Sequence, residues 1–363
     1  MDLFKDIVGQ NAVTENLSAA ILNNKLHHAY LFSGPSGVGK EAVAIELVKI
    51  LNCQTGKGTS PYCGRCRSCR ELGSFTSDDL IYIFPSVFKS SDTEKAIREK
   101  NSQIRNALKK KAELKGYYKF DFKTGRFITL PQINEIKFFA RYNSIHNSRK
   151  FVILTMAELM NKEAQNSLLK ILEEPPKNMS FILISQNTSF LFDTIRSRCL
   201  NLDFPLLNQK DIKEFIKKYY PDILTNKSEQ LAKDSYGSID NLSKLISEKG
   251  SDLIDASNSM FDILNNTLPP QTVSLSDSLL DQFKMMSDAD VDYVLKKTVG
   301  RLIKEPFGED LKKSVEYKET IVNDFSNFYT LYKRNINPRL LMINLYLNYR
   351  EELKKWKKQK TKR

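Results

Sequence analysis

The chain has 363 residues, of which 41% are hydrophobic, enough for the packed cores of two or three domains. No stretch reaches the roughly 20 apolar residues of a membrane span, and the N-terminal M-D-L-F-K-D-I does not resemble a signal peptide. We therefore expect a cytoplasmic protein without a membrane partner. The formal charge is +13, and the last eleven residues, L-K-K-W-K-K-Q-K-T-K-R, carry seven positive charges. Such a tail is either a solvated chain end or a grip for a phosphate backbone.

Strand and helix signals alternate over residues 1–206. A helix is expected at 40–51, a second begins at Thr129 with Pro131 in its first turn, and a third begins at Asn161 and stops before Pro175. Continuous apolar runs predict strands at 29–33, 80–84, 151–155 and 181–185. This alternation predicts an α/β domain with a parallel sheet covered by helices on both faces.

Residues 89–117 interrupt this alternation. The segment is polar, rich in lysine and helical in propensity, so we expect an inserted, solvated surface helix, although its charge could also contact DNA. From residue 207 onward helical signals dominate. They predict a small helical domain at 207–250 and a larger helical domain at 251–363 that ends in the basic tail.

Residues 34–41 read G-P-S-G-V-G-K-E and lie between a predicted strand and a predicted helix, the order that a phosphate-binding loop requires. The glycines let backbone N–H groups turn toward phosphates, and Lys40 can reach the β- and γ-phosphates. The predicted nucleotide-binding residues of this loop are Gly34, Pro35, Ser36, Gly37, Val38, Gly39 and Lys40.

Hydrolysis needs groups that this sequence lacks. The loop motif ends in Ser or Thr, which holds Mg²⁺, but Glu41 stands there and adds a negative charge. Acidic residues are expected after the strand at 151–154, where Thr155 and Met156 stand instead. We therefore expect ATP or ADP to bind weakly or not at all, Mg²⁺ not to be held, and turnover to be negligible.

Four of the five cysteines form the pattern C-x₉-C-x₂-C-x₂-C. In a cytosolic chain this spacing indicates a metal site rather than disulfides, and four thiolates suit structural zinc. An iron–sulfur cluster is the main alternative. The predicted ligands are Cys53, Cys63, Cys66 and Cys69, whereas Cys199 is expected to be a buried core thiol.

Several stretches in chain order carry a family resemblance: F-K-D-I-V-G-Q at 4–10, H-A-Y-L-F-S-G-P-S-G-V-G-K at 28–40, the four-cysteine insert, N-S-L-L-K-I-L-E-E-P-P at 166–176, and S-R-C at 197–199. Together they resemble bacterial DNA polymerase III clamp-loader subunits, of the AAA+ class. The resemblance implies a RecA-like core with a zinc knuckle at 1–206, a helical lid at 207–250 and a helical collar at 251–363, where N-P-R-L at 337–340 matches the collar.

Within this family the chain is more similar to delta-prime than to the tau/gamma motor subunits. The discriminating positions are Glu41, Thr155, Met156 and Asp240, which stands where the motors carry a phosphate-sensing Arg. The resemblance implies a non-hydrolysing stator in a hetero-pentamer with tau/gamma and delta subunits, acting on the sliding clamp and primer–template DNA in replication. It also implies that Arg198 serves in trans as an arginine finger and that Val8 lies near an adenine.

Two other functions remain open from the sequence. The first is a catalytically active AAA+ ATPase of the tau/gamma type with unusual metal ligands. The second is a nucleic-acid-binding module that uses the zinc knuckle, the lysine-rich insert and the basic tail, and it predicts tight, salt-sensitive binding of DNA by the isolated chain.

Overall fold

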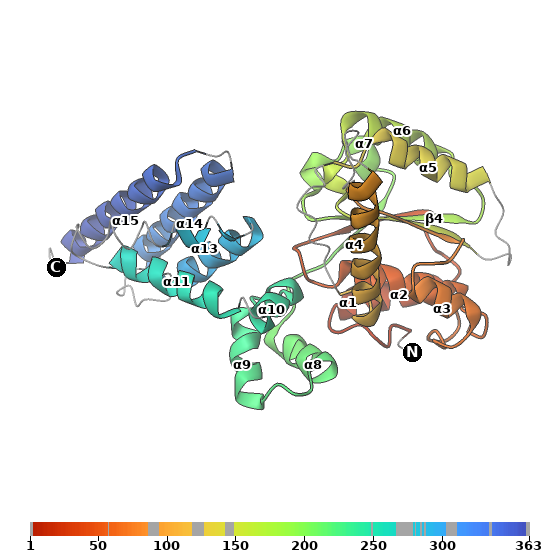
Figure 1. Ribbon diagram of the computed structural model, residues 1–363, viewed down its shortest axis with the longest axis horizontal. Helices are drawn as coiled ribbons and strands as arrows, with labels where there is room; N and C mark the ends of the chain where they lie inside the picture. Colours follow the sequence, from red (N-terminus) through yellow and green to blue (C-terminus); the bar gives the residue numbers. More distant parts are fainter. Residues whose placement is uncertain are drawn as a thin grey trace. The chain divides into compact units, whose positions relative to one another are not determined.

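The computed structural model in Figure 1 describes residues 3–56, 58–85, 94–117, 127–141, 149–247, 250–265, 279, 281–283, 285–286, 288–302, 311–333 and 336–360. The chain divides into two compact units, residues 1–242 and residues 243–363. Boundaries at 206 and 250 remain a prediction, because this division does not resolve a separate lid.

A parallel sheet forms the centre of the first unit. Its strands are β1 (Ala29–Ser33), β2 (Leu80–Ile83), β3 (Lys150–Leu154), β4 (Met179–Ser185) and β5 (Leu200–Asp203), in the order β2-β3-β4-β1-β5. In register, Tyr30 lies opposite Ile182 on one side and Leu200 on the other. The predicted strands are confirmed, whereas β5 was missed. This edge strand reads L-N-L-D and is largely exposed, so it lacks the apolar run of a central strand.

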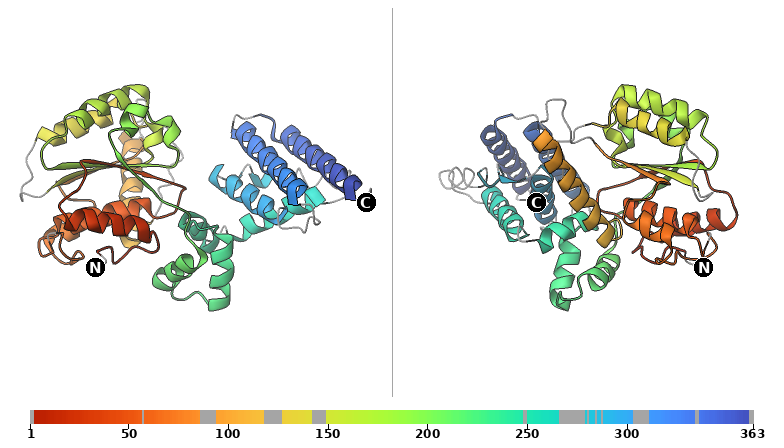
Figure 2. Two further views of the ribbon diagram at one scale, coloured as in Figure 1. Left: turned by 180° about the vertical axis from the view of Figure 1, so that it is seen from behind. Right: turned by 45° about the vertical axis from the view of Figure 1, so that its right-hand side comes forward.

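Helices cover both faces of the sheet, as predicted. One face carries α1 (Asn11–Leu22), α2 (Lys40–Asn52) and α3 (Arg67–Gly73), and the other carries α5 (Leu130–Arg141), α6 (Lys162–Glu173) and α7 (Asp193–Arg196). Two short 3₁₀ turns, Ala157–Leu159 and Thr188–Phe190, lie in the loops. Successive strand residues alternate between two hydrophobic cores: Phe32 faces α2, whereas its neighbour Leu31 faces α6. Figure 2 shows the two helical layers with the sheet between them.

Local signals fix several helix ends. The Asn161 side chain accepts the N–H of Ala164 at 2.9 Å, which caps α6 as its sequence predicts. At the start of α5 the Gln132 side chain accepts the N–H of Thr129 at 3.1 Å, the returning half of a capping box.

Helix α4 (Glu94–Glu113) confirms the helix predicted in the insert but corrects its environment. We expected a solvated surface helix, yet Lys111 is fully buried and Tyr117, just beyond the helix, is buried as well. The lid region contains α8 (Gln209–Tyr219), α9 (Thr225–Asp234) and α10 (Ile239–Ile246), again as the helical pattern predicts.

The second unit is helical. It contains α11 (Gly250–Asn265), α13 (Asp288–Leu302), α14 (Leu311–Lys333) and α15 (Pro338–Lys360), packed around a core that includes Met260, Val294 and Phe325. The helix breaks predicted at 268–270 and at Pro306 lie outside the described residues. Among the described helices, none is both long and apolar enough to span a bilayer.

Candidate functional site

The phosphate-binding loop connects the end of β1 to the start of α2, the predicted strand–loop–helix order. Gly34, Gly37 and Gly39 all have positive φ, at 139°, 76° and 95°. A Cβ on Gly34 would lie 2.2 Å from the carbonyl oxygen of Phe204, so no other residue fits there. The loop backbone therefore has the tight, glycine-dependent course that a phosphate cradle needs.

The start of α10 contacts this loop directly. The Ser36 hydroxyl donates to the Asp240 carboxylate at 2.5 Å, and the Ile239 N–H donates to the carbonyl of Gly37 at 2.8 Å. A Cβ on Gly37 would lie 2.3 Å from the hydroxyl oxygen of Ser238. The loop is thus packed against the start of α10. Asp240, which contacts the loop here, is the residue that the resemblance aligns with the phosphate-sensing Arg of the motor subunits.

Lys40 does not extend its ammonium group into open space. Its Nζ donates to the carbonyl oxygens of Gly34 and Pro35, each at 2.5 Å, and the residue is buried. The loop's own backbone therefore satisfies the group that would bind β- and γ-phosphates.

Glu41 is surrounded by donors. Lys111 forms an ion pair with its carboxylate, the Tyr82 hydroxyl donates to it, and the Thr155 hydroxyl donates to it at 2.7 Å. Burial acts to raise the pKa of Glu41, but the charge of Lys111 and these hydrogen bonds outweigh it and hold the pKa below its usual value. The negative charge that the sequence places at Glu41 is therefore neutralised within the chain by Lys111.

Thr155 and Met156 lie where the sequence places them, directly after β3. Thr155 is buried and its hydroxyl is used by Glu41, while Met156 adopts a left-handed backbone with φ of 53°. Neither side chain can act as a carboxylate ligand of Mg²⁺ or as a general base.

Tyr117 occupies the other end of the site. Its hydroxyl accepts the backbone N–H of Val8 at 2.9 Å, and its ring packs edge-on against Phe215 of α8, with centroids 4.9 Å apart. Val8 is buried there. Tyr117 thus links Val8 to the loop site, whereas a place for Val8 beside an adenine stays a prediction.

A cavity of about 50 Å³ remains, lined by the loop, the insert, the ends of β3 and β4, and Asp240. Small-molecule sites are typically ~300–1,000 Å³, so this space has room for a few waters but not for a nucleotide. Among the described residues that line it, the carboxylates are Glu41 and Asp240, and both are engaged by other side chains.

The four predicted metal ligands come together. Cys53 follows α2, Cys63 and Cys66 lie in the connecting loop, Cys69 lies in α3, and their sulfur atoms are all within 4.8 Å of one another. The Sγ atoms of Cys63 and Cys69 are 4.0 Å apart, close to the ~3.8 Å edge of a tetrahedron with zinc–sulfur bonds of about 2.3 Å. The cluster could therefore hold a metal ion such as zinc.

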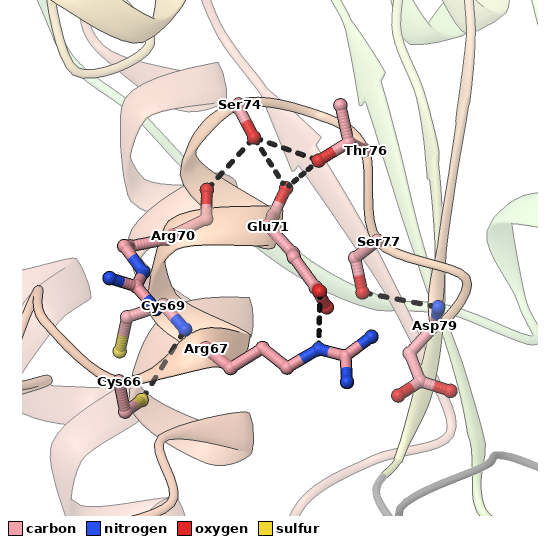
Figure 3. Close-up of polar contacts among 9 residues, drawn as sticks. All are labelled: Cys66, Arg67, Cys69, Arg70, Glu71, Ser74, Thr76, Ser77 and Asp79. Carbon is pink, nitrogen blue, oxygen red and sulfur yellow. Dashed lines mark hydrogen bonds and ion pairs between the residues drawn. The ribbon is translucent and has the colours of Figure 1, made fainter.

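Backbone N–H groups point at these sulfurs. The N–H of Cys69 donates to the Sγ of Cys66 at 3.4 Å, as Figure 3 shows, and the N–H of Cys66 donates to Cys63 at 3.3 Å. Hydrogen bonds from the Thr55 side chain and from the backbone N–H groups of Arg65 and Cys66 lower the pKa of Cys63 to about 5. Donors that favour the thiolate suit a metal site, because the thiolate is the ligand.

Arg198 lies on the surface after α7. Its guanidinium donates to the Glu173 carboxylate at 2.8 Å and to the carbonyl of Thr194 at 2.9 Å, and its side chain is 33% exposed. Arg196 pairs with Asp193 nearby. Cys199, expected to be a buried core thiol, is half-buried against the α5–α6 core, and this burial raises its pKa to about 12.

Sequence reasoning missed Lys111, Tyr82 and Tyr117, which complete the loop site. One signal was available: the aromatic Tyr117 directly follows the lysine-rich stretch, and a large aromatic ring favours burial. Nothing in the sequence specified which lysine of the insert would reach Glu41.

Comparisons with known proteins agree with the resemblance. The family described as "DNA polymerase III, delta subunit" matches residues 9–208. A DNA polymerase III subunit gamma of Buchnera aphidicola is 30% identical over 59% of this chain and 48% of its own length. The subunit tau of Escherichia coli is 32% identical over 58% of this chain and 26% of its own length. The chain therefore spans less than half of each relative.

A crystal structure of a DNA polymerase III gamma subunit-related protein from Thermotoga maritima aligns with 93% of this chain and 98% of that chain, at 17% identity and a TM-score of 0.45.

Proposed function

This chain belongs to the DNA polymerase III delta-subunit family of clamp-loader AAA+ proteins, and from that premise we propose that it is a delta-prime-like subunit that hydrolyses no ATP itself. It would act in a hetero-pentamer with tau/gamma and delta subunits that loads the sliding clamp onto primer–template DNA. The observation that carries the proposal is the environment of Glu41. This carboxylate forms an ion pair with Lys111 and a hydrogen bond with Thr155 at the place where a magnesium site is needed.

The chemistry of the site supports this assignment. Phosphoryl transfer in loop-type NTPases depends on Mg²⁺ held by the loop hydroxyl and a strand-end carboxylate. Here the first position is an ion-paired Glu41, and the second is Thr155. At these two positions the described residues therefore offer neither a carboxylate ligand for Mg²⁺ nor a general base that could orient water.

We assign Arg198 the role of an arginine finger for the nucleotide of a neighbouring subunit. Its guanidinium is partly exposed, and exposed ion pairs such as that with Glu173 are worth only about 0–1 kcal/mol. Exchanging Glu173 for a phosphate oxygen therefore costs little. A finger supplied in trans can accelerate phosphoryl transfer by about 10³–10⁵-fold.

The four-cysteine cluster is proposed to hold one structural zinc ion. Four thiolates close the tetrahedron and leave no open position, so the ion would stabilise the loop between α2 and α3 rather than take part in chemistry.

The experiment compares Arg198→Ala with Arg196→Ala in a complex reconstituted from this chain, a gamma or tau subunit, delta, clamp and primed DNA. Both variants remove one surface arginine from the same short segment, and Arg196 pairs only locally with Asp193. We expect Arg198→Ala to assemble normally and to lower the DNA-stimulated ATPase, with Arg196→Ala at the wild-type rate. Equal rates for both variants and wild type would remove the finger assignment.

A further inference from the structure

We propose that the end of the insert, residues 111–117, is a built-in plug that keeps ATP and ADP out of the phosphate-loop site in the free protein. The inference rests on the proposed function, in which this site does not hydrolyse ATP. It adds that the insert, rather than a defective loop, excludes the nucleotide.

The first contact of the plug is a cation. Lys111 has no exposed surface, and its ammonium pairs with Glu41, which also accepts from Tyr82 and Thr155. In an active site, a magnesium ion would be held from the positions of Glu41 and Thr155. Here these two residues bond to each other, and Glu41 is paired with the positive charge of Lys111. A lysine from the insert thus supplies within the chain the charge that a metal ion would bring.

The second contact is an approach that only glycine allows. Gly116 has φ of 92°, and a Cβ there would lie 2.8 Å from the Cα of Ala42 and 2.9 Å from the side chain of Ile45. The backbone of the insert therefore lies directly on the first turns of α2, the helix that follows the loop. A single added methyl group would push the insert away from this helix.

The third contact is Tyr117. A Cβ on Gly39, the last glycine of the loop, would lie 3.1 Å from the Tyr117 ring, so the ring lies against the loop itself. The hydroxyl takes the N–H of Val8, and the ring also packs on Phe215 of the lid. Sugar and base of a nucleotide must extend away from phosphates on the loop, and the ring fills part of that space.

The loop is otherwise intact, which distinguishes a plug from a decayed site. Its three glycines keep positive φ, and Lys40 is present and folded back on carbonyls of the loop. What remains is a cavity of about 50 Å³ whose walls include Lys111, Gly116 and Tyr117. Removing these walls should therefore restore room next to a loop that can still bind phosphates.

The test measures ADP binding by calorimetry in the full-length protein. The plug variant is Gly116→Ala combined with Tyr117→Ala, and the control is Gly73→Ala, where the nearest atom to a new Cβ lies at an ordinary 3.6 Å. A nucleotide that needs an open site binds more weakly by the open fraction. We expect no detectable binding by wild type or control, and a gain of at least about a hundredfold in the plug variant.

Micromolar binding by wild type would overturn the plug, as would a folded plug variant that does not bind ADP. If the variant fails to fold, amide exchange of wild type decides: 10 mM ADP should leave exchange in the loop and in 111–117 unchanged. Protection of the loop without exposure of the insert would contradict the plug. Binding of ADP without hydrolysis of ATP would contradict the plug alone, whereas ATP hydrolysis by wild type would also contradict the proposed function, so the two failures are distinguishable.

Discussion

The ion pair between Lys111 and Glu41 makes a sharp stability prediction. Lys111→Met keeps the length of the side chain but leaves a largely buried carboxylate without its counter-charge. Removing one partner of a buried pair costs about 3–5 kcal/mol. The Glu41 side chain retains 19% exposure, so we expect the lower end, about 3 kcal/mol, at pH 7. The double variant Lys111→Met with Glu41→Gln should recover most of the lost free energy of unfolding, because it no longer contains the uncompensated carboxylate charge.

The pH dependence of these variants has a definite sign. In wild type the pKa of Glu41 is lowered, so its ion pair stabilises the fold above the unfolded pKa and that stability is lost as the pH falls through the folded pKa. In Lys111→Met, burial is no longer offset and the pKa should rise. The variant should therefore lose less stability relative to wild type at pH 5 than at pH 7.

The assay must report the first unit. The only tryptophan of the chain is Trp356, in the second unit, so its fluorescence would follow the wrong transition. Amide exchange of β3 and β4 under increasing urea gives the free energy of opening of the sheet directly. A loss below about 1 kcal/mol for Lys111→Met, or a double variant as unstable as the single one, would refute a buried ion pair at this site.

Two further predictions concern Glu46 and the cysteine cluster. Burial raises the pKa of Glu46 from 4.5 to about 7, although the N–H of Asp6 donates to it, so the folded state holds the proton more tightly. The free energy of unfolding should therefore fall by about 3 kcal/mol as pH rises from 4.5 to 7. Urea titrations of Glu46→Gln should lack this pH dependence. The same pH dependence in wild type and Glu46→Gln would rule out a raised pKa at Glu46. Cys66→Ser should lose about one zinc per chain by metal analysis and destabilise the first unit, whereas Cys199→Ser should retain it; a wild-type protein without metal would end the zinc assignment.

Much of the first unit follows from local patterns in the sequence. Apolar runs identify central strands because both faces of a parallel sheet are buried, and Asn161 and Gln132 mark helix starts through hydrogen bonds within a few residues. The cysteine cluster was predictable for a similar reason, since C-x₂-C spacing alone places sulfurs near one another. By contrast, β5 is polar and short, and its position depends on pairing with β1.

The partners of Glu41 could not be predicted, because they depend on contacts distant in sequence. Lys111 lies 70 positions from Glu41 in a lysine-rich segment, and lysines are almost always exposed unless paired. The prediction of a solvated surface helix is therefore wrong at the C-terminal end of α4, where Lys111 is buried. For Arg198 the difficulty is different. In the isolated chain it pairs with Glu173, and a role in trans would depend on contacts with a neighbouring subunit.

The central claim is that this chain hydrolyses no ATP, and the most direct measurement is the ATPase activity of the purified chain alone, with Mg²⁺ and with or without primed DNA. The account predicts a rate no higher than that of Lys40→Ala. Turnover comparable to that of a gamma or tau subunit, abolished by Lys40→Ala, would contradict it.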